Sequence, residues 1–247
     1  MRLRDRRRRG TPCIVPCPSR LAASSALLPA LLIAAPAWAQ QQDTQAWEQL
    51  NLVVPVTSTV RVTLEEIART SDRQSGIYTT EFGVLLGWRV ADGVELGIGY
   101  RRVGFYNANT APDENRLRQQ IVLTRGRFAG RLRLDERFVA GGGEVGFRFR
   151  PLLRYNLPLA GTRVTPFVSH ESFILPNSTR WGQRAGYERM RNIAGVSFPL
   201  GKALTADVGY LNQYRPGRGG ARAQMDHALN VQLTVNLGAL GVVGLHD

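Results

Sequence analysis

His170 and Ser172 are the two residues of this 247-residue sequence whose types and spacing could perform catalysis. Side chains two positions apart lie on the same face of a β-strand, so an imidazole at position 170 can reach a hydroxyl at position 172. In that arrangement the histidine is a general base and the serine is a nucleophile. Such chemistry also needs a third group that orients the imidazole, and the nearest candidates are Asn192 and Glu188.

Outer-membrane lipid hydrolases carry a comparable His-x-Ser pair, with Asn directly after the serine. Phe173 stands in that place here, and a chain with three histidines produces such a pair easily by coincidence. We therefore expect no catalytic activity, and we keep a lipid hydrolase that uses His170 and Ser172 as the alternative. The two hypotheses differ in whether a carboxamide or a carboxylate lies within hydrogen-bond reach of the His170 ring.

A second set of chemically distinctive residues is a ladder of arginines in residues 128–139 and 144–156. Charged and apolar residues alternate there, so one face of each segment is cationic and the other is apolar. Guanidinium groups pair with carboxylates or bind phosphate and other anions. The charged face is expected to contain Arg131, Arg133, Asp135, Arg137, Arg148, Arg150 and Arg154, with Glu65, Glu81, Glu95 and Glu171, and also Arg61, Arg89, Arg101, Arg116, Arg118, Arg191 and Asp207.

The elements that must position these residues are β-strands. Period-2 alternation of apolar and polar residues recurs throughout the chain after residue 40, most clearly at 229–237. Turn residues such as those at 91–93 separate the segments, and short turns alternate with longer polar connections. Strands are expected near 46–54, 58–68, 81–90, 94–101, 115–125, 128–139, 145–155, 163–174, 186–200, 203–214 and 229–237.

These segments predict an all-β protein, a closed antiparallel up-and-down transmembrane β-barrel of 10–12 strands. An odd count would indicate that one strand was split or missed. Segments of about 10–12 residues suit a tilted bilayer crossing, whereas strands of soluble sandwiches average about five or six. Aromatic residues near segment ends fit an interfacial girdle, namely Trp47, Tyr78, Trp88, Tyr100, Phe128, Phe138, Tyr155, Tyr210 and Tyr214.

In a barrel of this size the charged face lines the lumen and largely fills it. Charges in a confined interior persist when they are paired, so we expect the arginine ladder to contact the lumen carboxylates, above all Glu171. The favoured interpretation is a salt-bridged interior that stiffens a structural or narrow-pore barrel. Because arginines outnumber carboxylates on this face, a narrow anion-preferring path is the alternative.

Residues 1–39 have the features of a signal peptide. Six arginines in residues 2–9 precede an apolar run at 21–37, which ends in a small-x-small cleavage site, Ala37-Trp38-Ala39. Removing seven Arg and one Asp with this segment lowers the net charge from +13 to +7, and both cysteines are lost with it. The barrel is then expected at 40–238, with a short tail at 239–247, in the outer membrane.

Neither nucleic acid, a cofactor nor a metal ion is expected as a ligand. The basic residues alternate with apolar ones on strands of an exported protein, and no nucleic-acid-binding motif accompanies them. Gly97 and Gly99 lie within a strand and precede no helix, so they do not form a nucleotide-binding loop. The expected partners are outer-membrane lipids and the barrel-assembly machinery, and no feature of the sequence indicates an oligomeric state.

Several short motifs stand in a characteristic order along the chain. They include Gln45-Ala46-Trp47, the run RLRLDERF at 131–138 and the dipeptide His170-Glu171. Over residues 43–238 the sequence resembles the family named domain of unknown function 2490, predicted outer-membrane barrels of Gram-negative bacteria. The resemblance implies a barrel fold and an outer-membrane location, and no known activity. The chain departs from the family pattern at His170, where Asn is usual, and at Leu237, where an aromatic residue usually ends the last strand.

Overall fold

The structure, a computed structural model, describes residues 40–240. The expected signal peptide and residues 241–247 of the expected tail lie outside the described residues. The described chain contains eleven strands and one 3-10 turn, Leu237–Leu240. The strands are β1 (Gln41–Pro55), β2 (Val60–Ser71), β3 (Gly76–Ala91), β4 (Val94–Phe105), β5 (Glu114–Arg125), β6 (Phe128–Val139), β7 (Val145–Asn156), β8 (Thr165–Leu175), β9 (Gly186–Pro199), β10 (Leu204–Arg215) and β11 (Gln224–Asn236).

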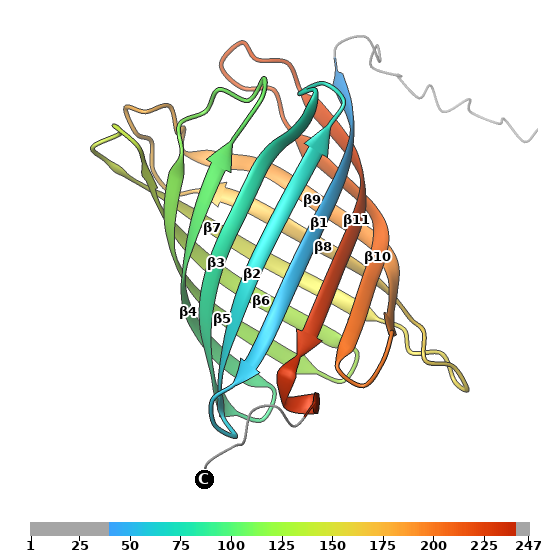
Figure 1. Cartoon of the computed structure of the whole chain (residues 1–247). Helices are drawn as coiled ribbons and strands as arrows, with labels where there is room; N and C mark the ends of the chain where they lie inside the picture. Colours follow the sequence, from blue (N-terminus) through green and yellow to red (C-terminus); the bar gives the residue numbers. More distant parts are fainter. Residues whose placement is uncertain (1–39, 241–247) are drawn as a thin grey trace, which may run out of the picture. The chain divides into compact units, whose positions relative to one another are not determined.

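The eleven strands form one closed barrel, which confirms the predicted fold class (Figure 1). Each strand pairs antiparallel with the next, and β1 and β11 close the barrel as a parallel pair. Consecutive strands of an antiparallel meander alternate in direction, so the first and the eleventh run the same way. The odd count therefore reflects a parallel seam in the described chain, and the expectation that it would indicate a split or missed strand is wrong.

Side chains alternate between the lumen and the outer face of the barrel. In β1 the buried residues include Asp43, Gln45 and Trp47, while the residues between them are exposed. This alternation reverses the polarity of a soluble protein, because large apolar side chains cover the outside. More than half of the surface of Phe82, Trp88, Ile98, Leu153 and Leu229 is exposed.

The interior of the barrel is polar and tightly filled. Arg118, Glu81, Asp135 and Gln213 are among the largest fully buried side chains, each no more than 2% exposed. A small apolar cluster around Trp47 completes the interior. Charged and amide side chains from the strands therefore fill most of the lumen.

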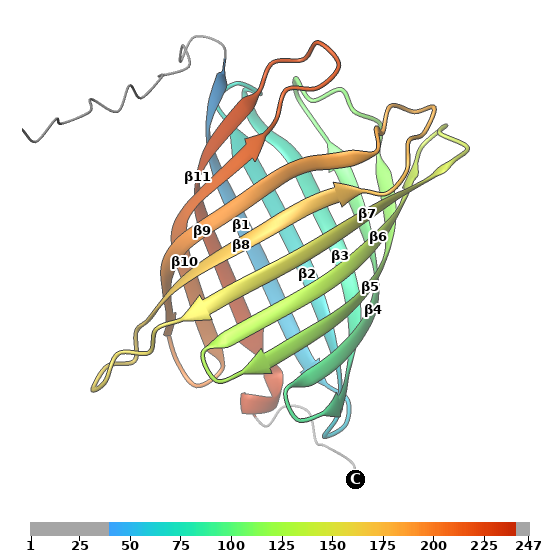
Figure 2. The same ribbon diagram turned by 180° about the vertical axis from the view of Figure 1, so that it is seen from behind.

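The connections are longer at one end of the barrel than at the other. Loops 106–113 and 176–185 extend from the end where β1 begins, whereas 92–93 and 126–127 are tight turns at the opposite end (Figures 1 and 2). The connection at 157–164 is the longest at the tight-turn end. In residues 40–240 we find no helix with the length and hydropathy of a transmembrane segment.

Loop 176–185 folds back over the mouth of the barrel. Trp181 Nε1 donates to the backbone carbonyl of Glu144 at 2.9 Å, and Gln183 is buried at the rim. Gly146 makes this approach possible, because a Cβ atom there would lie 2.5 Å from the Trp181 ring and 2.6 Å from the Gln183 amide oxygen. The loop thereby narrows this end of the lumen.

Candidate functional site

A glutamate of β3 connects three arginines inside the lumen. Glu81 contacts Arg101 of β4 at 2.6 Å, Arg69 of β2 at 2.7 Å and Arg116 of β5 at 3.6 Å. Arg101 in turn reaches Glu65 of β2 at 2.8 Å. Each carboxylate therefore ties several strands together, and a chain of charge-assisted contacts runs around this side of the lumen.

Glu171 of β8 is the corresponding centre on the opposite side of the barrel. Its carboxylate lies 2.6 Å from Arg131, 2.9 Å from Arg150 and 3.4 Å from Arg191. These arginines belong to β6, β7 and β9, so one carboxylate joins four strands. Glu171 occupies the place in the ladder that we expected for it.

Two further carboxylates, Asp135 and Glu65, extend the buried network. Asp135 of β6 is fully buried and lies 2.8 Å from Arg148 and 3.3 Å from Arg150, both on β7. Glu65 holds Arg118 of β5 at 2.5 Å in addition to its contact with β4. Arg150 is shared between two carboxylates, which links the β6–β7 pairs to the β8 centre.

Glu114 is a third carboxylate centre, and it was absent from the expected set. Its oxygens accept hydrogen bonds from Arg116 Nε at 2.7 Å and from Arg137 Nε at 2.6 Å. Glu114 is the first residue of β5 and follows a polar loop, so the start of the strand was hard to place. Glu114 lies two positions before Arg116 and four before Arg118, so all three side chains point to the same face of the strand. This spacing could have predicted that Glu114 faces the lumen.

Three expected lumen residues have partners other than those anticipated. Arg133 donates to Gln120 Oε1 at 2.7 and 3.0 Å, and no carboxylate of the described residues lies within 4.0 Å of it. The expected contact of Arg133 with an acidic group is therefore wrong, because Gln120 faces it across the β5–β6 pair. The other two form separate pairs: Glu95 with Arg61 at 2.8 Å and Arg154 with Asp207 at 2.5 Å.

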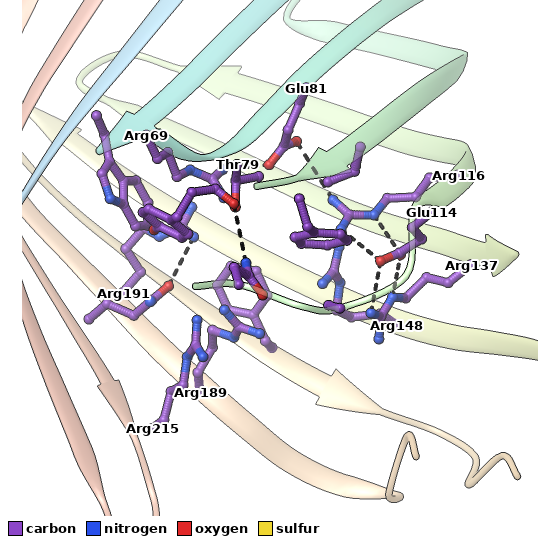
Figure 3. Close-up of a pocket in the computed structure, with 18 of the residues that line it drawn as sticks. Arg69, Thr79, Glu81, Glu114, Arg116, Arg137, Arg148, Arg189, Arg191 and Arg215 are labelled. Atoms are coloured by element: carbon purple, nitrogen blue, oxygen red, sulfur yellow. Dashed lines mark hydrogen bonds and ion pairs between the residues drawn. The ribbon is translucent and has the colours of Figure 1, made fainter. Parts of the chain in front are cut away.

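Two cavities remain between these side chains. One has a volume of about 250 Å³ and is lined by eight arginines and two glutamates (Figure 3). The other has a volume of about 150 Å³. Both are lined by Trp47, Arg69, Arg150 and Arg191, so these four residues lie between them.

These four residues form a partition between the two cavities, and Trp47 lies at its centre. Its ring lies between two guanidinium groups, 4.3 Å from that of Arg69 and 4.4 Å from that of Arg191, at cation–π distance. Its Nε1 donates to Gln45 Oε1 at 2.6 Å, and Tyr78 OH donates to the same oxygen at 2.9 Å. Placing Trp47 and Tyr78 in an interfacial girdle is therefore wrong, because both are buried and line the lumen.

On the outer face, β8 and β9 bring together four polar side chains, none of which is a carboxylate or a guanidinium. His170 Nδ1 lies 2.7 Å from Asn192 Oδ1, and His170 Nε2 lies 3.0 Å from Ser172 Oγ. Ser172 Oγ lies 3.2 Å from the Tyr187 hydroxyl. His170 and Asn192 are direct partners in the β8–β9 register. A carboxamide is thus within hydrogen-bond reach of the His170 ring, which is the feature on which the expected inactive protein and the alternative hydrolase differ.

A β-bulge determines which residues of β9 join this outer cluster. The β8–β9 register shifts between Phe173 and Ile174, so that Ile174 lies opposite Tyr187 and not opposite Glu188. Tyr187 thereby faces outward, whereas Glu188 pairs with Arg189 and lines an interior pocket at the mouth of the barrel. Of the two candidates for orienting His170, the structure brings Asn192 to the ring and turns Glu188 away.

The lumen and the outer cluster offer different chemistry. The lumen holds ions fixed by several partners each, with no nucleophile among the groups described above. The outer cluster places a hydroxyl, an imidazole and an amide in series, which is the arrangement that activates a nucleophile. Within the described part of the chain, no three metal-ligating side chains gather closely enough to hold a metal ion, and we assign neither site to one.

Comparison with known proteins places the chain in a family. Residues 44–225, from β1 to the start of β11, match the family described as "Protein of unknown function (DUF2490)". The chain is also similar to an uncharacterized protein of Methylorubrum extorquens, with 34% identity over 160 residues that cover 61% of this chain and 69% of the relative. No solved structure gives a significant match. The match over most of the barrel confirms the resemblance, and this chain belongs to the DUF2490 family of proteins of unknown function.

Proposed function

We propose that this protein is an outer-membrane β-barrel whose lumen is closed by ion pairs, so that its role is structural and not that of an open pore. The observation that carries the proposal is the reversed distribution of polarity. Charged groups are buried inside the closed barrel, and large apolar side chains cover its outside. Hydrocarbon favours this pattern, whereas water favours the opposite one.

Strand length supports a bilayer crossing. The strands contain between 11 and 16 residues. At about 3.3 Å per residue and a tilt near 45°, an 11-residue strand spans about 25 Å, close to the height of an outer-membrane apolar band. Closure leaves no strand edge unpaired in hydrocarbon. In this proposal outer-membrane lipids contact the apolar face, and the barrel-assembly machinery inserts the chain.

The partition around Trp47 supports a closed lumen. Trp47, Arg69, Arg150 and Arg191 separate the two interior cavities, and carboxylates of β3 and β8 hold the three arginines in place. Opening a path would break several buried ion pairs at once, which is costly because each leaves an uncompensated charge. We assign no chemical turnover to the lumen.

A narrow anion-preferring path is the second candidate. The observation in its favour is the lining of the larger cavity, where eight arginines face two glutamates (Figure 3). Rings of guanidinium groups favour anions over cations. This candidate requires that the partition around Trp47 opens, so the two proposals differ in a measurable property.

The location is tested by membrane fractionation with heat-modifiable gel mobility. We expect the protein in the outer-membrane fraction, with a folded band that moves differently from the boiled one. A band that stays with the soluble periplasmic proteins would contradict the proposed location.

The closed lumen is tested by conductance in a planar lipid bilayer. We expect no steps from the natural protein, and anion-preferring steps from Trp47→Ala, because that substitution joins the two cavities. Trp88→Ala is the matched control, since Trp88 is on the outer face and is 54% exposed. Anion-preferring steps from the natural protein would favour the second candidate, and steps without ion preference would contradict both.

A further inference from the structure

In place of the sequence-based expectation of no catalytic activity, we propose that the outer face of β8 and β9 carries an ester-hydrolase site, with Ser172 as nucleophile, His170 as general base and Asn192 as the positioning residue. Its substrate class is a lipid acyl ester. The choice of a lipid substrate rests on the proposed membrane location, whereas the hydrolase chemistry rests on the side-chain geometry alone.

The direction of the hydrogen bonds supports these roles. Asn192 Oδ1 is an acceptor 2.7 Å from His170 Nδ1, so Nδ1 carries the proton and donates it. The other ring nitrogen, Nε2, is then free to accept from the Ser172 hydroxyl at 3.0 Å. This tautomer is the one a general base needs, because its lone pair faces the nucleophile.

The site is open on the nucleophile's side. His170 and Tyr187 are exposed and Ser172 is half-buried, so a substrate can approach the hydroxyl from the outer face. With the serine proton directed to His170, the Tyr187 hydroxyl donates to Ser172 Oγ at 3.2 Å. The β-bulge that turns Tyr187 outward therefore completes the surroundings of the nucleophile, a common position for bulges.

The surroundings fit an acyl chain. An apolar groove of about 430 Å³ begins at His170 and Asn192 and continues past Leu153, Val168 and Tyr210 on the outer face. Ser172 lies three residues from the end of β8. That distance corresponds to about 7 Å along the barrel axis, so in the proposed membrane location the hydroxyl lies near the end of the strand, on the side of the membrane interface.

The reaction is an acyl transfer to water. Ser172 Oγ attacks the ester carbonyl carbon while its proton moves to His170 Nε2, and the resulting oxyanion collapses with cleavage of the bond to the alkoxy oxygen. The imidazolium returns the proton to the departing alcohol. Water then attacks the acyl-serine, giving a proton to His170, and the fatty acid leaves as Ser172 regains its proton. One ester and one water thus yield one carboxylic acid and one alcohol.

The first test measures fatty-acid release from a diacyl phosphatidylethanolamine in mixed detergent micelles by the purified, folded chain. We expect release by the natural protein, none above background by Ser172→Ala, and a loss of about 10²–10⁴-fold in His170→Ala. Ser197→Ala on the neighbouring strand β9 is the matched control, because Ser197 lies outside the groove, and its activity should be unchanged. In parallel, a fluorophosphonate probe should attach to Ser172 with loss of fluoride, as detected by mass spectrometry.

The positioning role of Asn192 has its own readout. Asn192→Ala should lower kcat by about 10²-fold with KM unchanged, because the base loses its orienting acceptor but the groove remains. Asn192→Asp should restore most of the activity, since its carboxylate accepts the same N–H bond. A purely structural role for Asn192 predicts no such rescue.

The outcomes separate the hydrolase from the proposed location. If the folded chain shows neither a Ser172 adduct nor release above Ser172→Ala, the hydrolase is overturned. If it forms the adduct and hydrolyses a p-nitrophenyl ester but no phospholipid, the lipid substrate is overturned. A soluble periplasmic protein that still forms the Ser172 adduct would overturn the membrane location and leave the hydrolase chemistry intact.

Discussion

The lumen and the outer face of β8–β9 both hold polar side chains in hydrogen-bonded networks, but they hold them differently. In the lumen the groups are charged, and Asp135 is fully buried between two arginines. On the outer face the network contains no carboxylate or guanidinium, and it is a short series from Asn192 through His170 to Ser172. In the lumen the carboxylates are paired with arginines of the same network, whereas the outer series ends at the Ser172 hydroxyl, which a ligand can approach.

The difference shows why charge alone is a poor guide to a reactive site. An ion removed from water needs several partners, and each partner restricts its movement. A neutral group needs about one hydrogen bond per donor, so it can remain reactive without destabilising the fold. The charged lumen is therefore best suited to stabilising the barrel, and the outer cluster is best suited to chemistry.

The largest expected effect comes from removing a buried carboxylate in the lumen. Asp135→Ala leaves Arg148 without a carboxylate partner and should lower the free energy of unfolding by about 3–5 kcal/mol. Urea unfolding in lipid vesicles, followed by tryptophan fluorescence, measures this change. Asp113→Ala is the control, because Asp113 forms an exposed pair with Arg102. Equal stability of the two variants would remove the distinction between the lumen and the surface.

Arg133 should respond with the opposite sign. It is buried and bonded to Gln120 without a carboxylate within 4.0 Å, so Arg133→Met removes a buried charge that lacks an ionic partner. We expect the free energy of unfolding to rise by about 1–2 kcal/mol in the same assay. Arg133→Lys keeps the charge and serves as the control. A loss of stability in Arg133→Met would mean that this guanidinium stabilises the lumen through its amide contact alone.

A smaller effect is expected for the outer cluster. Asn192→Ala removes one exposed hydrogen bond and should lower the free energy of unfolding by about 0.5–1.5 kcal/mol, since no charge loses its partner. The same vesicle assay measures it beside Asp135→Ala. A loss as large as that of Asp135→Ala would show that the outer cluster is also a stabilising network, contrary to the comparison above.

The smallest effect is expected at the rim, where Glu144 pairs with Arg180 at 2.6 Å. The backbone N–H and the guanidinium of Arg180 lower the pKa of the Glu144 carboxyl below its ordinary value. A lowered pKa contributes stability above the ordinary pKa of glutamate, about 4.3, and the contribution is lost as the pH falls through the folded-state value. Because Arg180 is 90% exposed, Glu144→Gln should cause no measurable change at pH 7. Unfolding midpoints of both proteins between pH 3 and pH 7 test this, and a clear gap at pH 7 would contradict it.

Alternation along the chain was sufficient to predict the class of the fold and the faces of most residues. In a regular strand without a bulge, the direction of a side chain follows the parity of its position, so Arg148, Arg150 and Glu171 could be assigned to one face from the sequence. The alternating segments indicated strands of about 10–12 residues, and their number indicated a barrel of 10–12 strands. These properties are local, and the sequence by itself determined them.

Which residues meet was decided by the tertiary structure. The barrel closes where the first strand, β1, pairs with the last strand, β11, in parallel register. Glu114 became a centre for two arginines, and Arg133 met an amide, because of the residues that lie opposite them on neighbouring strands. The alternation within one strand could not predict these partners, because it does not determine which residues of the neighbouring strand lie opposite.

The outer cluster illustrates the same limit. The sequence placed His170 and Ser172 on one face, but it left Asn192 and Glu188 as equal candidates for the third residue. One β-bulge turned Tyr187 outward and Glu188 inward, and the register of β8 with β9 placed Asn192 opposite His170. A shift of one residue would have reversed every one of these choices, because it moves each side chain to the other face of the sheet. Parity is set within a strand, whereas register is set by the closure of the whole barrel, and only the folded chain contains that information.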